Sequence, residues 1–380
     1  MMKVYLDNAA TTPLAPEVLD AMLPYMKDGF GNPSSTHSHG REIRAVIEKA
    51  RKQVAELLGA SPSEVFFTSG GTESDNIFIR GVVRAKQVQH IITSRIEHHA
   101  VLHTVEDLAK SKAVQLHYVD LDERGMVDYK SLSVLLEQFP NSLVSLMYGN
   151  NEIGNITDIT EIGRLCKEFG TIFHSDTVQT VGHFPINLKE ESVDAIVGSA
   201  HKFHGPKGVG FLYLRGGSEI PPMFTGGGQE REMRSGTENI YGIIGLAKAL
   251  EISLSDLEEH KIHIEGLKKR MIDKLKAGIP GVEFNGCSGE MDQSLYTILN
   301  IGIPSSVTNS MLLFSLDLAG ISVSGGSACG SGANQGSHVI KEISLKSIDM
   351  EIVRFSFSRY TTEEEVDYAV EKLMSLLAIG

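Results

Sequence analysis

A short apolar run leads into a single lysine in the segment Val193-Asp194-Ala195-Ile196-Val197-Gly198-Ser199-Ala200-His201-Lys202. The apolar run, residues 193–198, is typical of a buried strand. Gly205-Pro206-Lys207-Gly208-Val209-Gly210 then predicts a sharp turn, and Phe211-Leu212-Tyr213-Leu214 predicts the next strand. Lys202 therefore lies just past the end of a buried strand, where functional residues tend to collect.

A lysine in this position is costly to bury unless its charge is used or removed. Desolvation lowers the pKa of an amine, and a neutral amine forms a Schiff base with an aldehyde such as that of pyridoxal phosphate (PLP). An isolated lysine is more often a solvated surface residue. The assignment of Lys202 as a nucleophile therefore depends on the other motifs of the chain.

Further apolar runs alternate with helical segments along the first two thirds of the chain. Strands are predicted at residues 90–93, 115–119, 143–147 and 171–174, and a helix at residues 159–169. This alternation indicates a mostly parallel sheet covered on both faces, in which ligands bind at the carboxyl ends of the strands. The polar residues that follow predicted strands are Thr72, His98, Asn151, Asp176 and Lys202.

A glycine turn separates another predicted strand, residues 65–68, from a helix that runs through Arg84. The turn is Ser69-Gly70-Gly71-Thr72-Glu73-Ser74-Asp75-Asn76. Free backbone N–H groups at a helix start, beside a hydroxyl, attract anions. We expect this turn to hold a phosphate, although a Gly-Gly pair alone is more typical of a plain tight turn.

Asp176 lies at the carboxyl end of the buried strand predicted at residues 171–174. A buried carboxylate without a partner is costly, so Asp176 needs a cation. The pyridinium nitrogen of PLP is one, because a carboxylate beside it keeps the ring protonated as an electron sink. The alternative is that Asp176 caps a following helix.

The pattern changes after Ile240. A long, mostly helical stretch over residues 241–277 precedes several strands and a last helix that begins at Thr361 or Thr362. We expect a large PLP-binding domain over residues 16–255. We expect a smaller α+β domain over residues 1–15 and 256–380.

The composition limits the classes of function. The chain has 380 residues, 41% hydrophobic and 22% charged, as in ordinary globular proteins. Its net charge of -13 argues against binding nucleic acid or anionic membrane through bulk electrostatics. No stretch reads as a signal peptide or membrane span, and three widely spaced cysteines suit a reducing cytoplasm. Cys166 is expected in the core, while Cys287 lies in a turn that could be exposed and has no assigned role.

Seven motifs, in order along the chain, resemble those of cysteine desulfurases. These enzymes are the sulfur-liberating branch of the class V aminotransferase-like, fold type I PLP enzymes. The resemblance implies an α/β large domain with a mostly parallel seven-stranded sheet covered by helices, plus a smaller α+β domain. The motifs are Thr72-Glu73-Ser74-Asp75-Asn76, Glu97-His98-His99-Ala100-Val101, Asn150-Asn151-Glu152-Ile153-Gly154, His174-Ser175-Asp176-Thr177-Val178-Gln179, Ser199-Ala200-His201-Lys202, Arg234-Ser235-Gly236-Thr237 and Ser327-Ala328-Cys329.

The resemblance implies roles for the matching residues around the cofactor. Lys202 would bear PLP as a Schiff base, and Asp176 would face the pyridine nitrogen. Gln179 would reach the ring hydroxyl, and His98 would stack on the ring and shuttle protons. The phosphate would be bound by Gly71, Thr72, Ser199 and His201, joined in a homodimer by Thr237 from the neighbouring subunit.

The resemblance also implies a substrate and a sulfur carrier. Asn151 and Arg354 would orient L-cysteine, the arginine through a bidentate clamp on its carboxylate. Cys329 would attack the substrate sulfur, leave L-alanine, and pass the sulfur to an acceptor such as an iron–sulfur scaffold protein. Cys329 is also the one candidate ligand for a transferred cluster; no metal site is otherwise expected. Gly325 and Gly330 depart from the family pattern, because small hydroxyl residues are common there.

Three alternatives stay open. A selenocysteine lyase would use the same site on a selenium-bearing substrate. An aminotransferase or another PLP lyase would leave Cys329 as a bystander. A PLP-bound docking protein without turnover would not need the full set of proton-handling residues.

Overall fold

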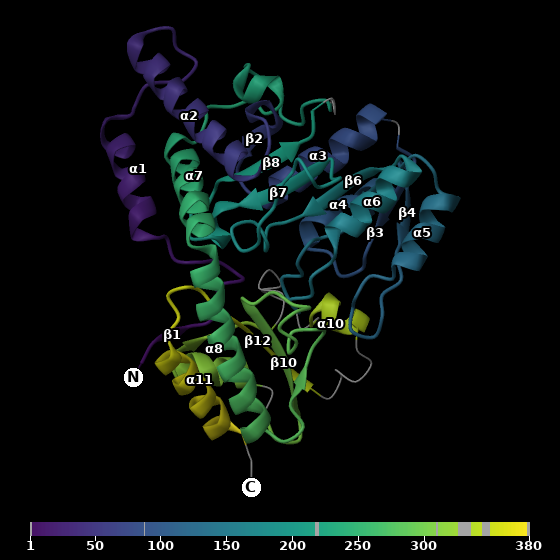
Figure 1. The fold of residues 1–380 in the computed structure, drawn as a ribbon, viewed down its shortest axis with the longest axis vertical. Helices are drawn as coiled ribbons and strands as arrows, with labels where there is room; N and C mark the ends of the chain where they lie inside the picture. Colours follow the sequence, from purple (N-terminus) through teal and green to yellow (C-terminus); the bar gives the residue numbers. More distant parts are fainter. Residues whose placement is uncertain are drawn as a thin grey trace.

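The computed structural model describes residues 2–86, 88–216, 220–308, 311–325, 336–343 and 350–377. A large sheet flanked by helices occupies one part of the molecule, and a smaller group of strands and helices lies at one end of it (Figure 1). This arrangement confirms the predicted α/β fold class. No helix in these residues is long and apolar enough to cross a membrane.

The large sheet has seven strands in the order β2-β8-β7-β6-β5-β3-β4. Only β8 runs antiparallel to its neighbours, so the carboxyl ends of the six other strands meet at one edge. The strands are β2 (Val65–Thr68), β3 (His90–Thr93), β4 (Gln115–Tyr118), β5 (Ser142–Ser145), β6 (Ile172–Asp176), β7 (Ala195–Ser199) and β8 (Gly210–Leu214).

Helices cover both faces of this sheet because successive strand residues point to opposite sides. In β7, Ala195 and Val197 belong to the core formed with α3 and α4, whereas Ile196 belongs to the core on the other face. The helices are α1 (Pro16–Asp28), α2 (Ser38–Leu57), α3 (Gly71–Lys86), α4 (His99–Lys110), α5 (Tyr129–Gln138), α6 (Ile159–Phe169) and α7 (Ile240–Ser255).

Local signals explain where α6 begins and ends. The Asp158 side chain accepts hydrogen bonds from the backbone N–H groups of Thr160 and Glu161, which caps the first turn. Gly170 ends the helix with a φ of 65°, a conformation that suits glycine. Cys166 lies on the buried face of α6, which confirms its predicted place in the core.

The smaller group of elements has its own apolar core. There β10 pairs antiparallel with β9 and β12, and the N-terminal β1 pairs with β11. The predicted long helical stretch is interrupted at Asp256, which separates α7 from α8. The elements are β1 (Val4–Tyr5), α8 (Leu257–Gly278), β9 (Glu283–Phe284), β10 (Ile298–Pro304), α9 (Leu312–Leu318), β11 (Ile321–Ser322), α10 (His338–Ile343), β12 (Met350–Ser356) and α11 (Glu363–Leu376).

A buried ion pair covers the outer edge of β2. Arg51 Nη1 donates to the Val65 carbonyl at 2.8 Å, and Glu230 Oε2 accepts from the Phe67 N–H at 2.8 Å. Arg51 and Glu230 also pair with each other at 2.7 and 2.8 Å, with both side chains 3% exposed. The two side chains therefore satisfy backbone groups that another strand would otherwise pair.

Replacing Glu230 with glutamine should lower the free energy of unfolding by about 3 kcal/mol, because the buried charge of Arg51 would keep only Glu48, a half-exposed anion 3.0 Å away. Chemical denaturation followed by circular dichroism measures the change. Glu161→Gln is a control, because Glu161 pairs with Arg164 on the surface and such pairs contribute little. Equal shifts for both variants would contradict the structural role of the buried pair.

Candidate active site

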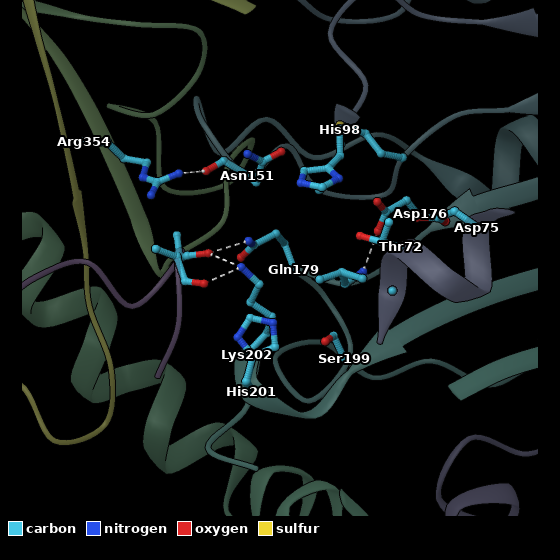
Figure 2. A pocket seen from close by; sticks show the side chains of 16 residues that line it. Thr72, Asp75, His98, Asn151, Asp176, Gln179, Ser199, His201, Lys202 and Arg354 are labelled. Atoms are coloured by element: carbon cyan, nitrogen blue, oxygen red, sulfur yellow. Dashed lines mark hydrogen bonds between the residues drawn. The ribbon is translucent and has the colours of Figure 1, made fainter. Parts of the chain in front are cut away.

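A cavity of about 210 Å³ opens at the carboxyl edge of the large sheet. Among the predicted site residues that the structure describes, it collects all except Thr237 (Figure 2). The predicted residues that line it are Gly71, Thr72, His98, Asn151, Asp176, Gln179, Ser199, His201, Lys202 and Arg354.

Lys202 ends a short 3₁₀ turn, η2 (Ala200–Lys202), that follows β7 directly. Its Nζ atom donates to the carbonyl oxygens of Ala9 and Ala10 at 2.6 and 2.8 Å. Figure 2 shows the amine inside the cavity, where the N-terminal segment supplies both acceptors.

Asp176 is the last residue of β6 and is only 6% exposed. Its Oδ1 accepts from the Val178 N–H at 2.9 Å, which forms a turn. Residues 177–194, all of them described, contain no helix, so the helix-cap alternative is wrong. Burial raises the pKa of Asp176, whereas His98 and Lys202 oppose that rise. A cation beside this carboxylate would stabilise its charged form.

Two acidic residues near Asp176, Glu97 and Asp75, are each only 1% exposed, which disfavours their charged forms. Burial raises the pKa of Glu97 to about 8 and, together with the charges of Asp176 and Glu97, raises that of Asp75 well above its usual range. Asp75 Oδ1 lies 3.3 Å from His174 Nε2, and burial lowers the pKa of His174 to about 3. Burial therefore disfavours the charged forms of these groups. A cationic ligand in the cavity would meet the carboxyl groups of Asp176 and Asp75, which both line it.

His98 caps the start of α4 and turns its ring toward the cavity (Figure 2). Its Nδ1 accepts from the Ala100 N–H at 3.1 Å, so in the neutral ring Nε2 carries the proton. Burial lowers the pKa of His98, and the charge of Asp176 opposes this effect. A neutral imidazole of this kind can both give and take a proton.

The start of α3 forms one end of the cavity. A Cβ atom at Gly71 would lie 2.6 Å from Val178 Cγ2, so the close approach of the backbone requires glycine. Ser199 and His201 lie beside Gly71 and Thr72. Burial, with the charges of Lys202 and Lys207, lowers the pKa of His201 to about 4. Backbone N–H groups, hydroxyls and a neutral imidazole together suit a phosphate.

Arg354 reaches the cavity from β12, at the opposite end from α3 (Figure 2). Its Nη1 donates to the Asn151 carbonyl at 2.7 Å, and its Nη2 donates to Asp7 Oδ1 at 2.9 Å. Gln179 lies between the two ends, where its Nε2 donates to the Ala9 carbonyl at 3.0 Å. The cavity thus has a helix start, whose N–H groups suit an anion, at one end and a guanidinium at the other.

The family model for class-V aminotransferases matches residues 4–369. The cysteine desulfurase IscS of Dictyoglomus turgidum is 43% identical over 378 residues, 99% of this chain and 94% of the relative. The chain belongs to the cysteine desulfurase family. Among solved structures, a NifS-like protein has a TM-score of 0.90 at 39% identity, covering 98% of this chain and 99% of that one. SspA in complex with cysteine has a TM-score of 0.81 at 31% identity, covering 94% and 100%.

Thr237 is exposed and lines a different cavity, of about 120 Å³, with Arg234 and Glu230. Cys329 lies outside the described residues. Cys287 is fully buried, with its Sγ 3.9 Å from Gln293 Oε1, so the suggestion that its turn is exposed is wrong. No cluster of acidic, histidine or cysteine side chains in the described ranges could hold a metal ion.

The N-terminal segment, residues 7–12, is the part of the site that the sequence analysis missed. It contacts Lys202 and Gln179 through its carbonyls, and Arg354 through Asp7. Thr11 Oγ1 lies 3.1 Å from His201 Nδ1. The segment Asn8-Ala9-Ala10-Thr11-Thr12 consists of small and polar residues and has neither strand nor helix periodicity. This lack of periodicity was the signal in the sequence that the segment could be a loop lining a site.

Proposed function

We propose that this protein is a PLP-dependent cysteine desulfurase. It converts L-cysteine to L-alanine and transfers the sulfur to Cys329 as a persulfide, for the synthesis of iron–sulfur clusters or other thio-cofactors. The convergence of Lys202, Asp176 and His98 on one cavity, with a phosphate-binding helix start at its end, carries this proposal. The family membership, and a relative whose structure contains cysteine, support L-cysteine as the substrate.

The residues of the cavity fit PLP. Lys202 would bind its aldehyde carbon, Asp176 its ring nitrogen and Gln179 its ring hydroxyl, and His98 would stack on the ring. The N–H groups and side chains of Gly71, Thr72, Ser199 and His201 would bind its phosphate. When bound, PLP supplies an electron sink for the charge that develops at the substrate Cα.

The chain's own groups then handle orientation and protons. Arg354 and Asn151 would hold the substrate so that its Cα faces Lys202. The Lys202 amine would take the Cα proton, and the Ala9 and Ala10 carbonyls would accept hydrogen bonds from the resulting ammonium. His98 would give or take a proton on the other side of the cavity.

Cys329 would complete the reaction as the nucleophile. Its thiolate would attack the substrate sulfur, so that a sulfur–sulfur bond forms and the Cβ–S bond of L-cysteine breaks. The electron pair of that bond stays on the substrate carbon skeleton, which takes up protons and leaves as L-alanine. The net change is L-cysteine plus a thiol giving L-alanine plus a persulfide.

We further propose a cytoplasmic homodimer with domains at residues 16–255 and at residues 1–15 with 256–380. The exposed position of Thr237 supports its contribution to the phosphate site of the partner. A protein acceptor, such as an iron–sulfur scaffold, would receive the sulfur. Neither nucleic acid nor membrane is a proposed partner, in keeping with the net charge of -13.

Product analysis tests this function. The loaded protein should form equal amounts of L-alanine and transferable sulfur from L-cysteine, without any keto acid. Faster turnover of L-selenocysteine with little turnover of L-cysteine would instead favour a selenocysteine lyase. Amino transfer that requires a keto acid and liberates no sulfur would favour an aminotransferase.

Asp176→Asn should lower kcat for L-alanine formation by about 10²–10³-fold, because a neutral amide cannot keep the ring nitrogen protonated. Steady-state kinetics measure the change, and absorption spectra show whether the cofactor is still bound. Asp194→Asn is the matched control. Asp194 is also an acid, partly buried, that accepts from the Phe173 N–H at 2.8 Å, but it precedes β7 at the opposite edge of the sheet. Similar losses of kcat in both variants would contradict the role of Asp176.

A further inference from the structure

Asp7 forms an ion pair with the guanidinium that would bind the substrate. Its Oδ1 lies 2.9 Å from Arg354 Nη2, and the same oxygen accepts from Ser324 Oγ at 2.7 Å. Ser324 is in turn paired with Arg354 through backbone hydrogen bonds in both directions. The carboxylate is therefore fixed beside Arg354 by two donors.

Arg354 lines the cavity and retains further hydrogen-bonding capacity. A guanidinium has five N–H donors, and the Asn151 carbonyl and Asp7 each accept one. Its Nε is buried without a hydrogen-bond partner among the described residues. Arg354 is 2% exposed and Asp7 is 18% exposed, so the positive charge is deep and the negative charge is closer to solvent.

We propose that Asp7 is the counter-ion that Arg354 must share with the substrate carboxylate, so that Asp7 weakens the binding of carboxylate ligands. This inference rests on the proposed role of Arg354. In the empty site Asp7 neutralises a guanidinium that would otherwise be buried without an anion. When a substrate carboxylate binds Arg354, two anions lie next to one cation and repel each other.

The electrostatic effect of Asp7 outweighs its effect on orientation. In Asp7→Asn, the hydrogen bond of Arg354 to the Asn151 carbonyl and its buried surroundings should remain, which would keep the guanidinium in place. The repulsion between the two carboxylates is reduced by solvent near Asp7 but not removed. Weaker binding of L-alanine, the product, favours its release.

Ligand binding to the PLP-loaded protein tests the inference. L-Alanine and ethylamine carry the same amine on a two-carbon skeleton and differ by the carboxylate, and absorption of the cofactor reports the binding of both. Asp7→Asn should bind L-alanine about 3–10-fold more tightly than the wild type and bind ethylamine equally well. Asp7→Glu, which keeps the charge, should resemble the wild type. Unchanged or weaker L-alanine binding, or equal changes for both ligands, would overturn the inference.

A second variant separates this inference from the proposed function. Arg354→Met should weaken L-alanine binding and leave ethylamine binding unchanged. If it does so while Asp7→Asn does not tighten L-alanine binding, only the inference about Asp7 fails. If Arg354→Met binds L-alanine like the wild type, both the inference and the proposed role of Arg354 fail. Asp7→Ser, a smaller neutral replacement, serves the same test if Asp7→Asn does not fold.

Discussion

Lys202→Ala should lower the rate of L-alanine formation from L-cysteine by at least ~10³-fold. Lys202 follows the end of β7 and lines the cavity between the start of α3 and Arg354. In the proposed mechanism, its loss would remove both the covalent anchor of the cofactor and the base for the Cα proton. Initial rates at saturating L-cysteine measure the effect, and added PLP should not restore the rate.

Lys268 offers a matched control for the loss of a buried amine. Its Nζ also donates to two oxygens, those of Ser294 Oγ and the Leu295 carbonyl, at 2.7 and 2.9 Å. Burial lowers its pKa to about 7, but it lies in α8 and does not line the cavity. Lys268→Met should change kcat by less than about 3-fold, although it alters stability. Comparable losses of kcat in the two variants would contradict the special role of Lys202.

Cys329→Ala should also abolish sulfur transfer, with L-alanine formation reduced by at least ~10²-fold. Without the thiolate, no group of the proposed mechanism attacks the substrate sulfur, so the Cβ–S bond stays intact. PLP binding should be unchanged, because none of the residues proposed to hold the cofactor is altered. Amino acid analysis and absorption spectra measure the two properties separately.

Cys287→Ser is the control for this cysteine. Cys287 is buried against Asn155 and Gln293, and burial raises the pKa of its thiol. It should therefore be a poor nucleophile, and its replacement should leave sulfur transfer intact. Undiminished L-alanine formation by Cys329→Ala, or loss of transfer in Cys287→Ser, would refute the assignment.

The larger strands could be predicted because they are continuous apolar runs. Residues 65–68 and 90–93 were predicted as strands, and β2 and β3 occupy those positions. β6 extends two residues beyond its predicted end, because Ser175 and Asp176 pair with Ile196 and Val197 of β7. β1 and β11 contain two residues each, too few for any periodic pattern to emerge.

The cavity could be predicted in part for a similar reason. In a mostly parallel sheet, residues that follow strands meet at one edge, so Thr72, His98 and Asp176 were expected to converge. The contact between Asp7 and Arg354 joins residues 347 positions apart and depends on how the N-terminal chain crosses the site. No local pattern in a single sequence predicts such a pairing.

Reduction of the PLP-loaded protein with borohydride, followed by mass analysis of its peptides, would identify the lysine that carries the cofactor. We predict a reduced PLP adduct on the peptide containing Lys202 and on no other lysine. An adduct on a different lysine, or a folded protein that takes up no PLP, would contradict the assignment of this cavity as the active site.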